Sequence, residues 1–103
     1  MSRRIFKYPV EIRDHFGLDL PRGARVLSVQ VQRDEPMMWA LVDPDAPSER
    51  AMFRVIGTGH PIDDPPETLD YVGTFQIHWG GLVFHLFREC PPVPTTIKLP
   101  GSL

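Results

Sequence analysis

The stretch YVGTFQIHWGGLVFHLFR, residues 71–88, decides the fold because apolar side chains recur at alternate positions on both sides of a glycine pair. This alternation of aromatic and aliphatic residues predicts two strands. Gly80 and Gly81 supply the positive φ that a two-residue turn requires, so a tight hairpin is expected. The predicted pairs are Trp79 with Leu82, Ile77 with Phe84, and Phe75 with Leu86. One face, wholly apolar and expected to be core, is Phe75, Ile77, Trp79, Leu82, Phe84 and Leu86; the other is Thr74, Gln76, His78, Val83, His85 and Phe87.

A second hairpin is predicted from residues 24–32 and 37–42, joined by the charged turn 33–36. We pair Gln32 with Met37, because this four-residue loop keeps one face apolar. A three-residue loop would instead turn Trp39 and Leu41 to the core. The preferred register gives a core face of Leu27, Val29, Val31, Met38, Ala40 and Val42 and an outer face of Ser28, Gln30, Gln32, Met37, Trp39 and Leu41.

Twelve prolines and eight glycines interrupt the chain too often for a helix of ordinary length. The predicted strands are residues 4–10, 18–20, 24–32, 37–42, 52–57, 71–79 and 82–88. Residues 11–16 are predicted to be a loop, residues 43–50 a surface turn and residues 60–70 a longer loop. The fold class is therefore all-β: a small antiparallel sandwich or partly open barrel of about six to seven strands.

The 103 residues suffice for one core, so we expect a single β-rich domain over residues 1–90. Residues 91–103 contain four prolines and no periodicity, which predicts a proline-rich, extended C-terminal arm. Alternating apolar residues in this arm would suit docking on a sheet edge, either its own or that of a neighbouring subunit.

Charge and cysteine content narrow the classes of function. The net charge of -2 argues against binding to a nucleic-acid backbone, although Arg3, Arg4 and Lys7 form a small basic cluster. Cys90 is the one cysteine, so no internal disulfide can form, and we expect a cytoplasmic protein with an inert thiol. The sequence has no apolar run of membrane-spanning length, so a membrane partner is not expected.

The residues that suggest chemistry are mostly ligand-binding candidates. Glycines in the segment 57–60 could free consecutive amides for an anion such as phosphate, although a simple strand end is the commoner meaning of this pattern. His78 and His85 share the outer face of the first hairpin with Gln76, either as ligand-binding groups or as hydrogen-bonded surface residues. The predicted ligand-binding residues are Gly57, Thr58, Gly59, His60, Gln76, His78 and His85.

Catalysis and metal binding are not expected. No serine stands in an elbow-like context, the acidic residues of the loop 60–70 have no calcium-loop spacing, and the histidine pair has no third ligand beside it in sequence. We therefore predict no catalytic residues, no metal and no cofactor. Large aromatic residues on strands are more often core residues, and the predicted register places Trp79 there; where Trp39 or Trp79 is exposed, it could stack on a base or anchor a protein partner.

Five segments together resemble a family of small, uncharacterised bacteriophage and prophage proteins. They are RIFKYP (4–9), LSVQVQ (27–32), WALVDP (39–44), GTGHPI (57–62) and YVGTFQ (71–76), and the resemblance spans most of residues 3–88. It implies an accessory binding protein, without catalytic activity, in the cytoplasm of a host cell. Such a protein could counteract host immunity by sequestering a nucleotide signal, often between subunits of a homo-oligomer, or by binding a host protein. One alternative is a virion or assembly component that uses its C-terminal arm for subunit contacts, and another is an enzyme with an unrecognised site.

Overall fold

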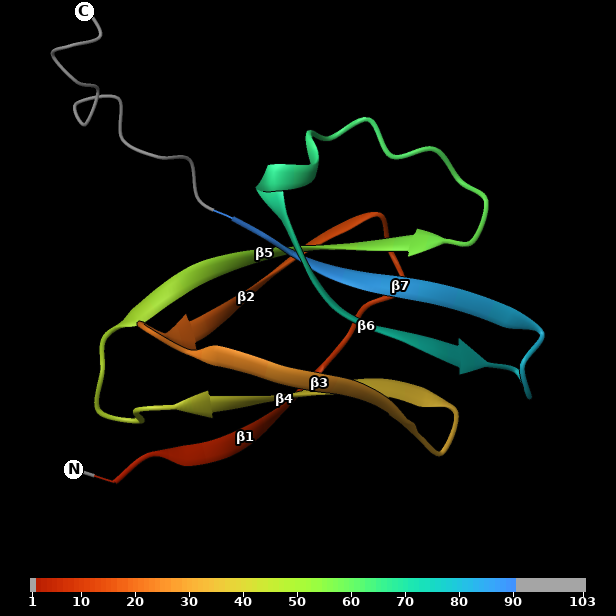
Figure 1. Ribbon diagram of the computed structural model, residues 1–103. Coiled ribbons are helices and arrows are strands. Elements are labelled where there is room, and N and C mark those ends of the chain that lie inside the picture. Colours follow the sequence, from red (N-terminus) through yellow and green to blue (C-terminus); the bar gives the residue numbers. More distant parts are fainter. Residues whose placement is uncertain (1, 91–103) are drawn as a thin grey trace, which may run out of the picture.

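The computed structural model describes residues 2–90, so the predicted arm at residues 91–103 lies outside the described residues. The described chain forms seven strands and one short 3₁₀ helix (Figure 1). The strands are β1 (Arg4–Pro9), β2 (His15–Pro21), β3 (Arg25–Gln32), β4 (Glu35–Val42), β5 (Ser48–Gly57), β6 (Leu69–Ile77) and β7 (Leu82–Glu89), and the helix η1 is Pro66–Thr68.

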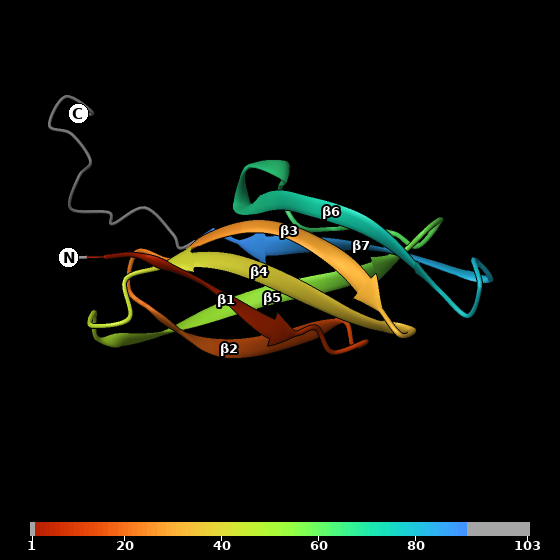
Figure 2. The same ribbon diagram turned by 90° about the horizontal axis from the view of Figure 1, so that it is seen from below.

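The strands form two antiparallel sheets, here called sheet A and sheet B. Sheet A has the order β1-β4-β3, and sheet B has the order β2-β5-β7-β6. The two sheets face each other, and β3 of sheet A packs against β6 of sheet B (Figures 1 and 2). The all-β class is thereby confirmed, with seven strands in two antiparallel sheets in the described residues.

The core lies between the sheets and follows the alternation of the strands. In β4, Met38, Ala40 and Val42 are buried, whereas Met37, Trp39 and Leu41 are half-buried on the outer side. Sheet B contributes stacked rings of Phe16 and Phe53, with centroids 5.2 Å apart. Alternating burial is what a sheet with one covered face produces, because successive side chains point to opposite sides.

The β6–β7 hairpin has the predicted faces but a different turn. The observed pairs are Ile77 with Leu82 and Phe75 with Phe84, a shift of two residues from the predicted register. The turn spans residues 78–81 and is closed by a hydrogen bond from Gly81 N–H to His78 O at 2.9 Å. A shift of two preserves which residues share a face. The prediction of Trp79 in the core was wrong, because the longer turn places it outside the ladder. The prediction of Leu82 in the core was also wrong, since Leu82 is exposed at the end of the ladder, next to the turn.

The β3–β4 turn is shorter than predicted, whereas the β6–β7 turn is longer. Gln32 pairs with Glu35 rather than with Met37, so the turn is only Arg33 and Asp34, which have φ of 52° and 64°. Positive φ at both central residues defines the type I′ turn that matches strand twist. The predicted core face is confirmed except for Leu27. That residue lies at a β-bulge between Val26 and Ser28 and is exposed.

The predicted connections were shorter in the structure. β2 begins at His15, inside the expected loop 11–16, and β5 begins at Ser48, inside the expected turn 43–50. The expected loop 60–70 contains η1 and the start of β6.

β6 lies against β3 at Gly73, which is beside a second bulge between Tyr71 and Gly73. A Cβ atom placed on Gly73 would lie 2.7 Å from Val29 Cγ1 on β3. This distance is too short for two carbon atoms, so the packing of β3 on β6 depends on the missing side chain.

We predict that Gly73→Ala lowers the free energy of unfolding by about 1–3 kcal/mol, because the added methyl group overpacks the contact. Urea denaturation measures the change. Val29→Ala removes the clashing methyl group, so the double variant should lose less stability than the sum of the two single variants by at least about 0.5 kcal/mol. Additive losses would contradict this account of the contact.

Candidate functional site

The segment Gly57–His60 forms a tight turn at the end of β5. His60 N–H donates to Gly57 O at 3.1 Å, and Gly59 has a φ of +89°. Positive φ at the third residue of a turn favours glycine. Thr58 N–H donates to Val83 O on β7 at 3.3 Å. Two of the amides expected to be free for an anion therefore donate within the protein.

The outer face of sheet B carries a chain of side-chain hydrogen bonds centred on His85. The His85 Nε2 atom lies 2.7 Å from Thr58 Oγ1, and Nδ1 lies 2.8 Å from Thr74 Oγ1. Thr74 Oγ1 in turn lies 2.5 Å from the Tyr71 hydroxyl. We call these four residues the His85 network. They come from the turn after β5, from β7 and from β6, and each strand contributes through its outward position.

The predicted site residues are divided between two places. Thr58 and His85 are in direct contact, and Gln76 lies on the same face of β6, where it pairs with Val83. The His60 ring lies beside Gly57, 3.4 Å from where a Cβ would stand. His78 is not part of this group, because it belongs to the turn at the end of the hairpin.

His78 instead joins the tips of the two hairpins. Its backbone N–H donates to Asp34 Oδ1 at 2.7 Å, and its Nδ1 lies 3.5 Å from Asp34 Oδ2. Asp34 lies in the β3–β4 turn, 44 residues away in the sequence. We call Arg33, Asp34 and residues 78–81 the hairpin-tip site.

Trp79 is the most exposed large apolar side chain in the described residues, with a relative exposure of 102%. His78 and Trp79 both adopt positive φ, at 54° and 53°. This conformation costs a non-glycine residue of order 1–3 kcal/mol, and it persists where the surroundings fix it. Here the Asp34 carboxylate holds the peptide that enters the turn, so the indole is presented on an anchored tip.

Arg54 anchors the loop that crosses the outer face of sheet B. Its guanidinium is buried. The Nη2 atom donates to Asp14 Oδ1 at 3.0 Å, and Nε donates to the Asp14 carbonyl oxygen at 3.2 Å. The Nη1 atom donates to the Asp64 carboxylate. The hydrogen bond from Arg54 lowers the pKa of the Asp64 carboxyl below its ordinary value. The same partners raise the pKa of Arg54, so the cation remains charged and paired.

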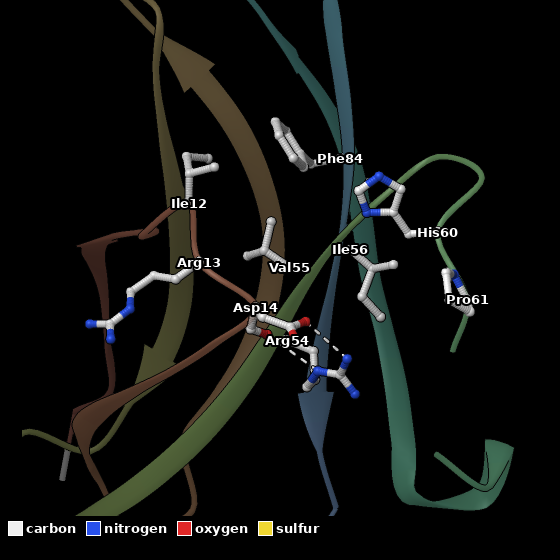
Figure 3. Close-up of a pocket in the computed structure, with 10 residues that line it drawn as sticks. Ile12, Arg13, Asp14, Arg54, Val55, Ile56, His60, Pro61 and Phe84 are labelled. Atoms are coloured by element: carbon white, nitrogen blue, oxygen red, sulfur yellow. Dashed lines mark hydrogen bonds and ion pairs between the residues drawn. The ribbon is translucent and has the colours of Figure 1, made fainter. Parts of the chain in front are cut away.

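Beside this ion cluster lies an open cleft of about 380 Å³. Figure 3 shows Phe84 and His60 at one end of the cleft and Asp14 and Arg54 at the other. Ile56 and Val55 form the apolar surface between them. Two cations line the cleft: Arg54 is held by Asp14 and Asp64, and Arg13 pairs with Glu11 at 3.2 Å. Both are already paired, so the cleft offers an apolar surface rather than a free charge.

The described residues contain no group of three or more histidine, cysteine or acidic side chains that could hold a metal ion. Burial and the Asp70 carboxylate raise the pKa of the Cys90 thiol, which disfavours the reactive thiolate. Among residues 2–90, no helix is long and apolar enough to cross a membrane.

Sequence reasoning missed Tyr71, Thr74 and Asp34. The predicted register sets Gln76 opposite His85, whereas the observed register sets Thr74 there. Thr74 was on the predicted outer face, so the correct turn length would have identified it. Nothing local in the sequence indicates the contact between Asp34 and His78, because it depends on how the two sheets pack.

A family model described as a domain of unknown function (DUF7352) matches residues 1–96 of the chain. No curated protein and no solved structure shows significant similarity to it.

We predict that Asp64 makes folding stability depend on acid pH. Because Arg54 lowers the pKa of Asp64 in the folded protein, its contribution is complete above the ordinary pKa of about 4 and is lost as the pH falls through the lowered value. Asp64→Asn should lower the melting temperature at neutral pH and show a smaller further decrease on acidification. Circular dichroism melts across the acid range test this, with the exposed neighbour Asp63→Asn as the control. An identical pH profile in wild type and Asp64→Asn would contradict it.

Proposed function

The chain belongs to the DUF7352 family, and from this premise we propose that it is a non-catalytic protein-binding domain whose partner is anchored by Trp79. The full exposure of this indole is the observation that carries the proposal. Tryptophan is strongly enriched among the residues that dominate binding energy in protein interfaces. A folded chain that exposes its indole in water gains apolar burial when a partner covers it.

The rigidity of the tip supports the same function. Binding through a mobile loop loses affinity to the cost of ordering it, whereas a preorganised loop avoids that cost. At the hairpin-tip site, the Asp34 carboxylate fixes His78, and the bond from Gly81 N–H to His78 O closes the turn. The backbone conformation at Trp79 is unfavourable in isolation, and such conformations cluster at functional sites.

Of the two binding modes that the resemblance implies, protein capture is better supported than sequestration of a nucleotide signal. A phosphate group requires free amides or a free cation. In the predicted loop, Thr58 N–H and His60 N–H donate to carbonyl oxygens, and nearby Arg54 is paired with Asp14 and Asp64. The hairpin tip, by contrast, offers a large aromatic anchor.

The partner is expected to be a host protein, in the cytoplasm of the host, if the phage setting implied by the resemblance applies. The alternative role in a virion or its assembly relies on the C-terminal arm, which lies outside the described residues. A chain that binds through Trp79 and is absent from purified particles fits the first role.

We predict that Trp79→Ala weakens partner binding at least about 30-fold, equivalent to about 2 kcal/mol, and changes folding stability by less than about 0.5 kcal/mol. Proteins from the host lysate retained by immobilised wild-type protein are identified by mass spectrometry, and the affinity for the purified partner is then measured. Ile5→Ala is the matched control, because Ile5 is an exposed apolar residue on the other sheet. Retention of the same partner by wild type and Trp79→Ala would reject the proposal.

Asp34 is a positioning residue for Trp79. We predict that Asp34→Ala also weakens partner binding, although Trp79 itself is unchanged, because the turn that carries Trp79 is no longer held. Asp34→Asn keeps an acceptor oxygen for His78 N–H and should restore most of the affinity. Trp79→Gly tests the strain, because glycine adopts positive φ freely: it should melt at the same temperature as wild type or higher, yet fail to bind. A clear decrease in melting temperature would contradict the assignment of strain.

A further inference from the structure

The His85 network is a second surface feature, separate from Trp79, and its hydrogen-bonding groups restrict the chemistry of a ligand. A neutral imidazole donates through one nitrogen and accepts at the other. The hydrogen bonds of the network therefore all point the same way along it. Either the Thr58 hydroxyl donates to Nε2 and the Tyr71 hydroxyl keeps a free proton, or Nε2 donates to Thr58 and the Thr58 hydroxyl keeps the free proton. One end of the chain offers a donor and the other an acceptor.

A ligand that meets both ends must donate at one and accept at the other, and the direction can reverse. Hydroxyl groups do both, because each has one proton and two lone pairs. A carboxylate or phosphate group can only accept when ionised. The network thus matches a ligand with several hydroxyl groups better than it matches an anion.

The charged groups around the network also favour an uncharged ligand, because the nearby cations are already paired. The nearest cation on β5, Arg54, is buried and held by Asp14 and Asp64. Glu89 on β7 pairs with His15 at 3.3 Å. Arg50 on β5 pairs with Asp19 at 3.3 Å, and Arg88 on β7 donates to the Ala24 carbonyl oxygen at 2.9 Å. An anionic ligand would therefore find the arginines of β5 and β7 already engaged and unable to offset its desolvation.

Tyr71 adds an apolar surface beside the hydroxyl groups. Its side chain is 61% exposed, and its ring rests edge-on against Phe87, with centroids 5.6 Å apart at 61°. The contact with Phe87 and the bond to Thr74 hold the ring in place. A held aromatic ring next to hydroxyl groups suits a molecule with both apolar C–H surface and hydroxyl groups.

We propose that the outer face of sheet B binds an uncharged saccharide, with one sugar ring packed on Tyr71 and its hydroxyl groups bonded to the ends of the His85 network. The C–H face of a pyranose ring packs on the tyrosine, and separate hydroxyl groups of the saccharide exchange hydrogen bonds with Tyr71 and with Thr58. The surface is shallow, so the affinity for a short oligosaccharide is of order 1 mM.

The test is a titration of ¹⁵N-labelled protein, followed by NMR, with hexasaccharides of β-1,4-glucose, α-1,4-glucose and β-1,4-N-acetylglucosamine, and with AMP for comparison. We expect saturable shifts for at least one sugar, confined to β6, β7 and the turn 57–60, and weaker or no binding of AMP. Absence of saturable shifts with all three sugars up to about 10 mM, or tighter binding of AMP, overturns the proposal.

Variants locate the site on the network. Tyr71→Ala should weaken sugar binding at least about tenfold, and Tyr71→Phe, which keeps the ring and loses the hydroxyl group, by about fivefold. Thr58→Val should also weaken it, whereas Ile5→Ala on sheet A should not. Trp79→Ala should bind the sugar as wild type does, which separates this site from the protein-binding function. Unchanged affinity in both Tyr71→Ala and Thr58→Val overturns the assignment.

Discussion

The close approach of β3 to β6 is the constraint on which the rest of the structure depends. Because Gly73 has no side chain, Val29 can lie against the β6 backbone, and the two hairpins run side by side to their tips. Only in that arrangement can the Asp34 carboxylate reach the peptide of His78. A contact in the core therefore determines the position of a surface tryptophan far along the same hairpin.

The two surface features arise from different parts of one hairpin. Within the ladder, Thr74 lies opposite His85, and the bulge between Tyr71 and Gly73 brings Tyr71 to the same face, so the three side chains are in contact. Beyond the ladder, the turn 78–81 directs Trp79 into solvent. Both features therefore depend on an irregularity of the hairpin, a bulge in one case and a turn with positive φ in the other.

The sequence predicted which residues share a face better than it predicted which residues are partners. Alternation identified Phe75, Ile77 and Leu86 as core and Phe84 as packed against it, since a shift of two residues leaves the faces unchanged. Turn length was not predictable from glycine alone: His78 and Trp79 take positive φ, and Asp34, which helps to hold them, is remote in sequence. Through that error Gln76 was assigned the place beside His85 that Thr74 occupies.

Each of the four strands at the borders of the sheets carries an interruption. β1 ends in Pro9 and β2 in Pro21, while β3 and β6 contain the bulges at Leu27 and Val72. A proline withholds an N–H group and a bulge breaks the regular spacing of a ladder, so neither border is a good template for another chain. Strand-by-strand growth into fibrils is thereby discouraged, even though the Trp79 indole faces water.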